Sequence, residues 1–194
     1  MDAREALKRM KEGNLRFVAG KSAEIHRTHK LVDNQEPFAI VLGCSDSRVP
    51  PEIIFDHGVG DMFCIRVAGN IITPLELGSV EFAALKFGPR LVIVMGHTKC
   101  GAVQATVETL QSEIRPELSP GMETIVDFIG QSVDTTASDD HNEIWSNAIK
   151  ANVHNAVDHL VRESEVVQQL MRDDGMLVVG ARYAIETGEV EFFD

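Results

Sequence analysis

The chain has 194 residues, a length that suits one domain with a full-sized hydrophobic core and is short for two. Hydrophobic residues make up 44% and charged residues 25% of the sequence, which excludes disordered, collagen-like and disulfide-scaffold proteins. The formal net charge of −12, from 18 basic and 30 acidic residues, argues against nucleic acid and anionic membrane surfaces as partners.

The N-terminal stretch MDAREALKRMKEGNLRF interleaves charged and apolar residues at helical spacing, which predicts an amphipathic helix that ends near Gly20. No uninterrupted apolar stretch approaches the roughly 20 residues that a membrane-spanning helix needs. We therefore expect a soluble, cytoplasmic protein, although a leader removed before residue 1 would leave no trace in the sequence.

Short apolar runs then alternate with helical patterns along the chain. The runs predict buried strands of a parallel sheet, at 37–43, 62–68, 90–96 and 176–185. Helical patterns occupy 75–87, 101–111 and 143–171, while 112–140 is interpreted as a loop-rich excursion with one short helix. A turn at 186–190 leads into a last short strand. This alternation predicts an α/β fold with a central β-sheet flanked by helices, in one domain that spans 1–194.

Three side chains with metal-binding chemistry follow the two most apolar strands. Cys44 comes directly after AIVLG, His97 directly after LVIVMG, and Cys100 three residues later, where the chain turns into the next helix. Ligands of open parallel sheets collect beyond the carboxyl ends of the strands, so we expect the three side chains to converge. The positive end of the helix that follows Cys100 should favour its thiolate.

A Cys2His set suits zinc, which prefers thiolate and imidazole ligands in tetrahedral geometry. Three protein ligands leave one position open for water, as in catalytic zinc sites. Asp46 and Arg48 follow Cys44 at alternate positions, and in an extended backbone all three would face one way. Asp46 could then bind the metal and close the site, or pair with Arg48 and leave the metal free for water.

The other residues of similar chemistry lack ligand spacing. Cys64 lies within a predicted strand and is interpreted as a buried thiol, and Trp145 as a packing residue of a helix. The three cysteines are an odd and sparse set, which fits a reducing compartment. No ligand role is predicted for the remaining histidines, which are His26, His29, His57, His141, His154 and His159.

At these residues the chain resembles the β-class carbonic anhydrases. The resemblance runs from about Glu36 to the C-terminus and rests on CSDSRV, RVAGN, GHTKCGAV and RYAIETGEVEF, of which the paired CxDxR and HxxC motifs are the most specific. It implies a mostly parallel sheet, and an N-terminal helical arm over 1–35 that packs on the partner subunit. It also implies a homodimer that in many members pairs into a homotetramer.

The resemblance implies reversible hydration of CO2 to bicarbonate and a proton, by attack of zinc-bound hydroxide on CO2. Carried over by position, the Zn²⁺ ligands are Cys44, His97 and Cys100. Asp46 and Arg48 match the catalytic dyad, in which the aspartate orients the hydroxide.

Four further positions match the substrate site of the plant-like members. Gln35 matches a glutamine that hydrogen-bonds substrate across the dimer interface, while Phe63 and Ala68 match residues that line the CO2 pocket. Gly101 matches a position where the backbone comes close to the site. Without the resemblance, Gln35 is interpreted as a polar residue of a surface loop, and Phe63 and Ala68 are interpreted as core residues. Gly101 is then interpreted as a glycine at the start of a helix.

The members that bicarbonate inhibits carry a tryptophan, an arginine and a tyrosine at three positions. Arg66 and Tyr183 match the last two, but Val41 stands at the first, so the resemblance favours the plant-like subtype with an open site. Two other functions stay open at this point. One is hydrolysis of COS or CS2 on the same scaffold, and the other is a non-catalytic zinc protein in which Asp46 completes a four-ligand site.

Overall fold

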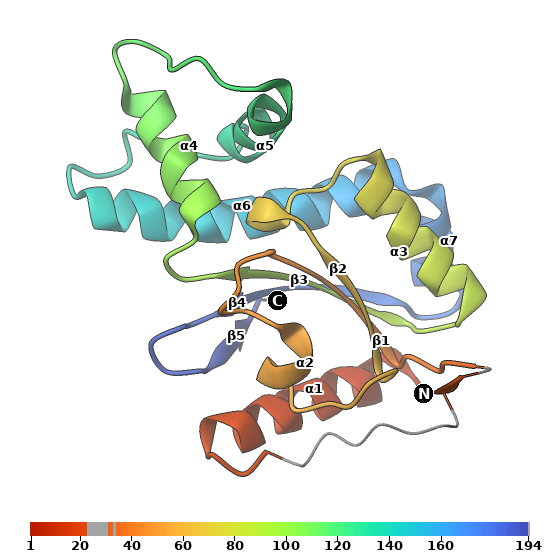
Figure 1. Cartoon of the computed structure of the whole chain (residues 1–194). Coiled ribbons are helices and arrows are strands. Elements are labelled where there is room, and N and C mark those ends of the chain that lie inside the picture. Colours follow the sequence, from red (N-terminus) through yellow and green to blue (C-terminus); the bar gives the residue numbers. More distant parts are fainter. Residues whose placement is uncertain (23–30, 33, 194) are drawn as a thin grey trace.

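The computed structural model describes residues 1–22, 31–32 and 34–193 (Figure 1). Over these residues the chain forms one five-stranded sheet in the order β2-β1-β3-β4-β5, in which β5 alone is antiparallel to its neighbour. The predicted α/β fold with a mostly parallel sheet is thereby confirmed. The strands are β1 (Ala39–Gly43), β2 (Met62–Arg66), β3 (Leu91–His97), β4 (Leu177–Tyr183) and β5 (Val190–Phe192).

Helices cover both faces of this sheet. They are α1 (Ala3–Val18), α2 (Pro51–Ile54), the 3-10 turn η2 (Ala68–Asn70), α3 (Pro74–Lys86), α4 (Gly101–Gln111), α5 (Pro120–Gly130), α6 (His141–Glu163) and α7 (Glu165–Asp173). In Figure 1, α1 and α2 lie on one side of the sheet, and α3, α6 and α7 on the other. The α4–α5 pair projects beyond the sheet, where it packs on α6. None of the described helices combines the length and the apolarity that crossing a membrane requires.

The long helical pattern at 143–171 is divided between two helices at Ser164. This buried serine has an extended backbone, with φ −106° and ψ 104°. Its hydroxyl accepts a hydrogen bond from the backbone N–H of Val167 at 3.0 Å and donates one to Glu81 at 2.6 Å. A side chain that caps a new helix and also bonds to α3 therefore ends α6, which apolar periodicity alone does not reveal.

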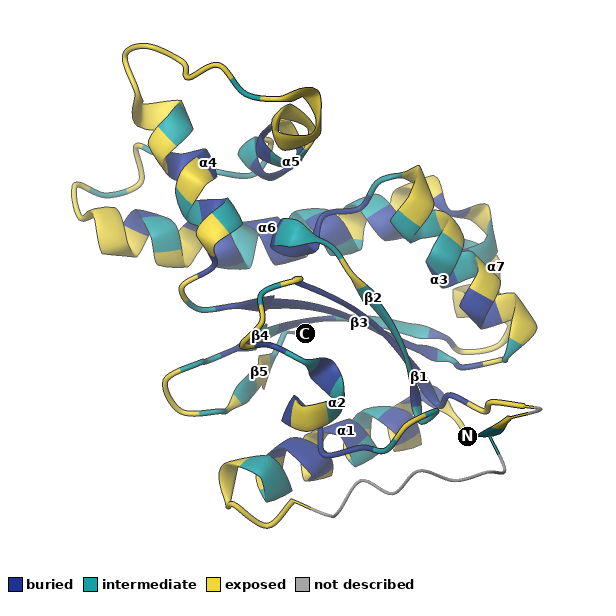
Figure 2. Cartoon of the chain, in the orientation of Figure 1, coloured by how far each residue is buried: buried dark blue, intermediate teal, exposed yellow. Residues whose placement is uncertain are grey.

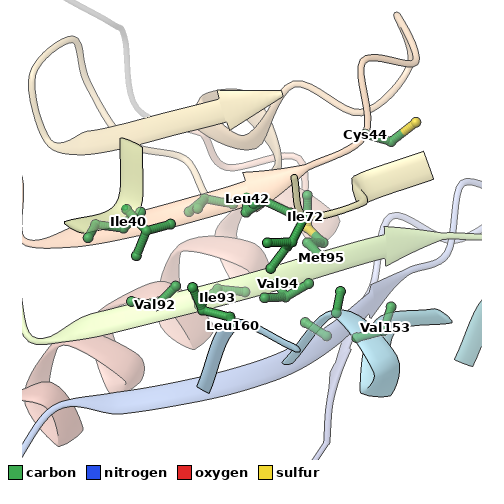
Figure 3. Close-up of a cluster of buried hydrophobic side chains, with 14 of the residues drawn as sticks. Ile40, Leu42, Cys44, Ile72, Val92, Ile93, Val94, Met95, Val153 and Leu160 are labelled. Atoms are coloured by element: carbon green, nitrogen blue, oxygen red, sulfur yellow. The ribbon is translucent and has the colours of Figure 1, made fainter. Parts of the chain in front are cut away.

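The core lies between the two central strands and α6. Every residue of β1 and β3 is buried, as expected for strands covered on both faces (Figure 2). Figure 3 shows Val153 and Leu160 of α6 packed beside β3, and Cys44 just beyond the end of β1. The helix lies so near the sheet that a Cβ at Gly96 would stand 2.6 Å from Val153 Cγ2, so only glycine fits there without displacing it.

The N-terminal helix packs on α2 and β3 of its own chain, and packing of the 1–35 arm on a partner subunit stays a prediction. The buried face of α1 includes Met10 and Gly13, and a Cβ at Gly13 would lie 1.8 Å from the carbonyl oxygen of Phe55. An amphipathic pattern shows which face of a helix is buried, but not which surface covers it. Residues 23–30 and 33 of the expected arm lie outside the described residues.

Buried Asn14 joins α1 to two other segments. Its Nδ2 donates to the carbonyls of Ile54 at 3.1 Å and Gly188 at 2.8 Å, and its Oδ1 accepts from the N–H of Val190 at 2.9 Å. We expect Asn14→Leu to lower the free energy of unfolding by roughly 2–4 kcal/mol, because these buried groups lose their partners. Urea denaturation at fixed protein concentration measures the change.

The control for this variant is Asn147→Leu, on the exposed face of α6. It should change the free energy of unfolding by less than about 0.5 kcal/mol. Equal unfolding midpoints for the two variants would show that α1 is not held to the fold through Asn14.

Candidate metal centre

Three residues from separate segments meet at the carboxyl edge of the sheet. Cys44 follows β1, His97 is the last residue of the neighbouring β3, and Cys100 is the N-cap of α4. Their ligand atoms all lie within 4.8 Å of one another, and all three residues are buried. The structure therefore brings together the set that the sequence selects for a metal.

The histidine of this group is arranged as a metal ligand. Its Nδ1 lies 2.9 Å from the carbonyl oxygen of Thr98, which can only accept a hydrogen bond, so Nδ1 carries the proton. The lone pair of Nε2 then points toward the two cysteines. This buried atom has no hydrogen-bond partner among the described residues, and a buried polar atom without a partner is costly. A cation held by Nε2 and the two sulfur atoms removes that cost.

The two cysteines differ in their affinity for a proton. The Cys100 thiol donates a hydrogen bond to Cys44, and this bond lowers the pKa of Cys44 well below that of a free thiol. Contacts with His97 and with the backbone N–H groups of Asp46 and Gly69 act in the same direction, while burial opposes them. Cys44 is therefore the sulfur that ionises first.

The pKa of Cys100 is raised, because its proton is held by the Cys44 sulfur and because burial disfavours its charged form. Backbone N–H groups at the start of α4 lower the pKa of Cys100, as its place before a helix predicts, but their effect is the smaller one. The expected effect of the helix end is present, and in the metal-free group the hydrogen bond to Cys44 and burial outweigh it. A thiophilic cation that binds both sulfur atoms takes the place of the shared proton.

Asp46 is not part of the metal group and pairs with Arg48. The guanidinium donates from Nε to Oδ1 at 2.9 Å and from Nη2 to Oδ2 at 2.7 Å, which is a bidentate pair. The backbone does not stay extended as expected, because the N–H of Arg48 also donates to Oδ1 at 2.9 Å and closes a turn at Asp46. These bonds from Arg48 hold the pKa of Asp46 far below its usual range, so the carboxylate stays ionised at working pH.

A second arginine fixes the segment that carries Cys44 and Asp46. Arg66 ends β2 beside Gly43, and its guanidinium donates to the carbonyls of Cys44 at 3.0 Å and Asp46 at 2.6 Å. Val41 is fully buried within β1, and Tyr183 pairs with His97 in the strand register. Arg66 is thus engaged with backbone carbonyls beside the metal group.

Two of the four residues assigned to the substrate site lie beside this group. Ala68 begins η2, whose next residue, Gly69, directs its N–H at Cys44 Sγ over 3.4 Å. Gly101 begins α4 directly after Cys100, and the space that a Cβ would occupy there is open. A small molecule could approach the metal group along this exposed glycine.

The other two residues lie away from the metal group of their own chain. Exposed Gln35 precedes β1 and lines a cavity of about 510 Å³ with Val59, Met62 and Phe87, at the amino end of the strands. Phe63 lies early in β2 and packs against Phe87, with ring centroids 5.9 Å apart. If either residue serves a metal site, it serves the site of another subunit.

The remaining cysteine and histidines stay outside the metal group. Cys64 is half-buried within β2, and burial, with Glu52 nearby, raises the pKa of its thiol. His57, His141, His154 and His159 do not join the group, while His26 and His29 lie outside the described residues.

Two residues of α6 that bond to the segments of the metal group carry no recognisable pattern in the sequence. Trp145, interpreted as a packing residue, donates from Nε1 to the carbonyl oxygen of Cys100 at 3.2 Å. Asn152 donates from Nδ2 to the carbonyl oxygen of Gly69 at 2.8 Å. The two residues lie about two helical turns apart on α6. This spacing indicates that they share one face of the helix, but not which residues that face contacts.

Comparisons with known proteins agree with this geometry. A family model described as carbonic anhydrase matches residues 39–190. Carbonic anhydrase 2 of Mycobacterium tuberculosis is 34% identical over 193 residues, which cover 97% of this chain and 92% of that protein. The carbonic anhydrase of Mycolicibacterium smegmatis is 36% identical, over 96% of this chain and 91% of that protein.

Solved structures resemble the fold as a whole. The β-carbonic anhydrase of the fungal pathogen Aspergillus fumigatus gives a TM-score of 0.73 at 30% identity, over 85% of this chain and 79% of that chain. One of two tetrameric β-carbonic anhydrases from the ascomycete Sordaria macrospora gives a TM-score of 0.75 at 22% identity, over 84% of each chain. At that identity the second comparison concerns the fold alone.

The metal group predicts that the protein binds one thiophilic divalent ion per chain. We expect Cys100→Ala to weaken Zn²⁺ binding by more than about 100-fold, because a charged ligand is lost. Competition with a chromophoric chelator measures the affinity. Cys64→Ala is the matched control and should bind Zn²⁺ as the wild type does; full metal content in Cys100→Ala would refute the ligand set.

Proposed function

Because the chain belongs to the β-class carbonic anhydrase family, we propose that it catalyses the reversible hydration of CO2 to bicarbonate and a proton, with Zn²⁺ held by Cys44, His97 and Cys100. One observation carries the proposal: the metal group has three ligands, while Asp46 is bound to Arg48 beside it. Bound Zn²⁺ supplies Lewis acidity that makes hydroxide available at neutral pH. Two thiolates neutralise the charge of Zn²⁺, so the neighbouring groups matter more than beside neutral ligands.

Asp46 orients the nucleophile in this proposal. An ionised carboxylate can only accept hydrogen bonds, so Asp46 selects the orientation in which the attacking oxygen directs its hydrogen toward the carboxylate and a lone pair toward CO2. Arg48 keeps this acceptor charged and in place through its two side-chain bonds, and Arg66 holds the carbonyl of Asp46 itself. The uncharged substrate needs only a small surface beside the nucleophile, which Ala68 and Gly101 leave free.

The pairing of Asp46 with Arg48 argues against a closed, four-ligand structural site. Both carboxylate oxygens accept hydrogen bonds from the guanidinium, and Oδ1 also accepts one from the backbone N–H of Arg48. Moving this carboxylate onto the metal would break all three bonds and leave the guanidinium with the carbonyl of Lys99, which it already contacts at 3.2 Å. An open fourth position is therefore the favoured state.

We propose that the protein works as a homodimer in which each subunit completes the site of the other. The face formed by α3 and the edge strand β2 exposes three large apolar side chains, Leu75, Phe82 and Leu85, which are 79%, 55% and 65% exposed. Monomeric proteins seldom expose such a patch. Phe63 packs under it against Phe82, and Gln35 lies close by through Phe87. A second copy that covers this face could receive Gln35 and Phe63 at its own metal group.

The role of Asp46 is tested by Asp46→Asn in stopped-flow CO2 hydration from pH 6.5 to 9. We expect kcat/KM to fall about 10–100-fold with metal content unchanged, because an amide can donate where the carboxylate only accepts. The pKa of Asp46 lies below the ordinary pKa of an aspartate. Its carboxylate would therefore lose its charge only at a pH below that ordinary pKa. The acid limb of the wild-type profile should therefore not come from Asp46.

The matched control is Asp134→Asn, because exposed Asp134 accepts a bond from the N–H two residues ahead, as Asp46 does, but lies in the 131–140 loop. It should leave activity unchanged. Wild-type activity in Asp46→Asn would refute its role, and turnover of COS in preference to CO2 would refute the proposed substrate.

Exchange of Gln35 between subunits is tested with mixed dimers of Gln35→Ala and Cys100→Ala, purified through two different tags. Each parent dimer should be impaired. The mixed dimer should recover about half the wild-type activity, because one of its two sites combines an intact metal group with an intact Gln35 from across the interface. No recovery in a dimer verified by sedimentation would place Gln35 in the site of its own subunit, and full activity of the Gln35→Ala parent would show that Gln35 serves no site.

A further inference from the structure

Helix α6 directs two side chains at the metal group from one face. Trp145 and Asn152 lie about two helical turns apart and therefore share one face of α6. Their hydrogen bonds to the carbonyls of Cys100 and Gly69 show that this face is turned to the carboxyl edge of the sheet. The helix is seated firmly, because the Cβ that Gly96 lacks would collide with Val153 Cγ2, and Val153 also lies 3.0 Å from the corresponding position at Gly180. The packing of Val153 on β3 and β4 therefore fixes the position of α6, and with it the positions of Trp145 and Asn152.

Asn152 reaches Cys44 through one intermediate residue. The asparagine is fully buried, and its Nδ2 donates to the carbonyl of Gly69 at 2.8 Å. Gly69 adopts φ +71°, and a Cβ there would stand 2.7 Å from Ile129 Cδ1, so the position is confined to glycine. On its other side, Gly69 directs its N–H to Cys44 Sγ at 3.4 Å. Asn152 thus anchors the peptide that follows Gly69, and through it the residue whose own N–H meets the sulfur.

Trp145 acts on the other sulfur ligand. Its Nε1 donates to the carbonyl of Cys100 at 3.2 Å, and the Nζ of Lys99 lies 5.1 Å from the centre of its ring. Lys99 has φ +57°, a conformation that a lysine rarely keeps unless its surroundings hold it. The indole therefore holds the turn between His97 and Cys100 from outside the metal group.

We propose that Asn152 and Trp145 are positioning residues through which α6 fixes the placement and the donor strength of the two thiolate ligands. The proposal rests on the proposed metal site. An N–H that donates to a thiolate draws electron density from the sulfur, so less is given to the metal, and the metal stays a stronger Lewis acid. This effect on Lewis acidity is most important in a site where two thiolates already neutralise the charge of the ion. Asn152 acts on Cys44 through this N–H···S bond, and Trp145 acts on Cys100 through its backbone.

The test uses Asn152→Leu, which keeps the shape of the side chain and removes its amide, and Trp145→Phe, which keeps an aromatic ring and removes the N–H. The matched control is Asn155→Leu. Asn155 lies on the same helix and also donates to a backbone carbonyl, that of Phe128 at 3.3 Å, but it holds α5 and not the metal group. All variants are measured as full-length protein, first stripped of metal.

Two readouts are independent of CO2 hydration. Chelator competition with Co²⁺ should show about 10–100-fold weaker binding in Asn152→Leu, and at least several-fold weaker binding in Trp145→Phe. In the Co²⁺-loaded protein, the sulfur-to-cobalt charge-transfer band of Asn152→Leu should move to longer wavelength, because the thiolate that loses its N–H donor is easier to oxidise. Asn155→Leu should match the wild type in both measurements.

Wild-type affinity and an unshifted band in Asn152→Leu would overturn the role of Asn152, and unchanged affinity in Trp145→Phe would overturn that of Trp145. If Asn152→Leu does not fold, as thermal unfolding of the metal-free protein would show, the half-buried and conservative Trp145→Phe decides alone. Failure of the proposed function is a different result: the wild type then either binds no Co²⁺ or binds it without hydrating CO2 when loaded with Zn²⁺.

Discussion

The parallel pairing of β1 with β3 is the constraint on which the metal group depends. Their register sets Gly43 beside Met95, so the residue after one strand and the end of the other arrive at the same edge of the sheet. Cys44 and His97 occupy those places. The buried, β-branched content of both strands fixes the register, because a slip by one residue would turn the apolar side chains out of their packing. The position of the metal ligands is thus decided by the hydrophobic core.

Around the three ligands, the protein arranges charge with backbone groups and arginines. Arg48 engages the carboxylate of Asp46, while Arg66 engages the carbonyls of Cys44 and Asp46. Arg48 holds this short segment from within, and Arg66 holds it from the end of β2. This leaves the carboxylate ionised and anchored two residues after Cys44. In the proposed hydration reaction, these groups would supply the electrostatic help that an ion neutralised by two thiolates needs.

The sequence was most informative where a single physical effect decides the structure. Continuous apolar runs predicted β1 and β3 to within two residues, and the strand-end positions of Cys44 and His97 followed from them. It was less informative where a side chain competes with the backbone, as in the turn that Arg48 closes at Asp46. Contacts that depend on helix placement left no local pattern, so the hydrogen bonds of Trp145 and Asn152 could not be foreseen. For the same reason, α1 could be recognised as amphipathic, but its contacts with α2 and β3 could not be foreseen.

The absence of a side chain at Gly96 links the packing of α6 on the sheet to the geometry of the metal group. Any larger residue there would push α6 off the sheet, and the bonds to Gly69 and Cys100 would move with it. A copy of the chain that packs poorly would therefore also hold metal poorly. Metal affinity would then report how well α6 is seated on the sheet.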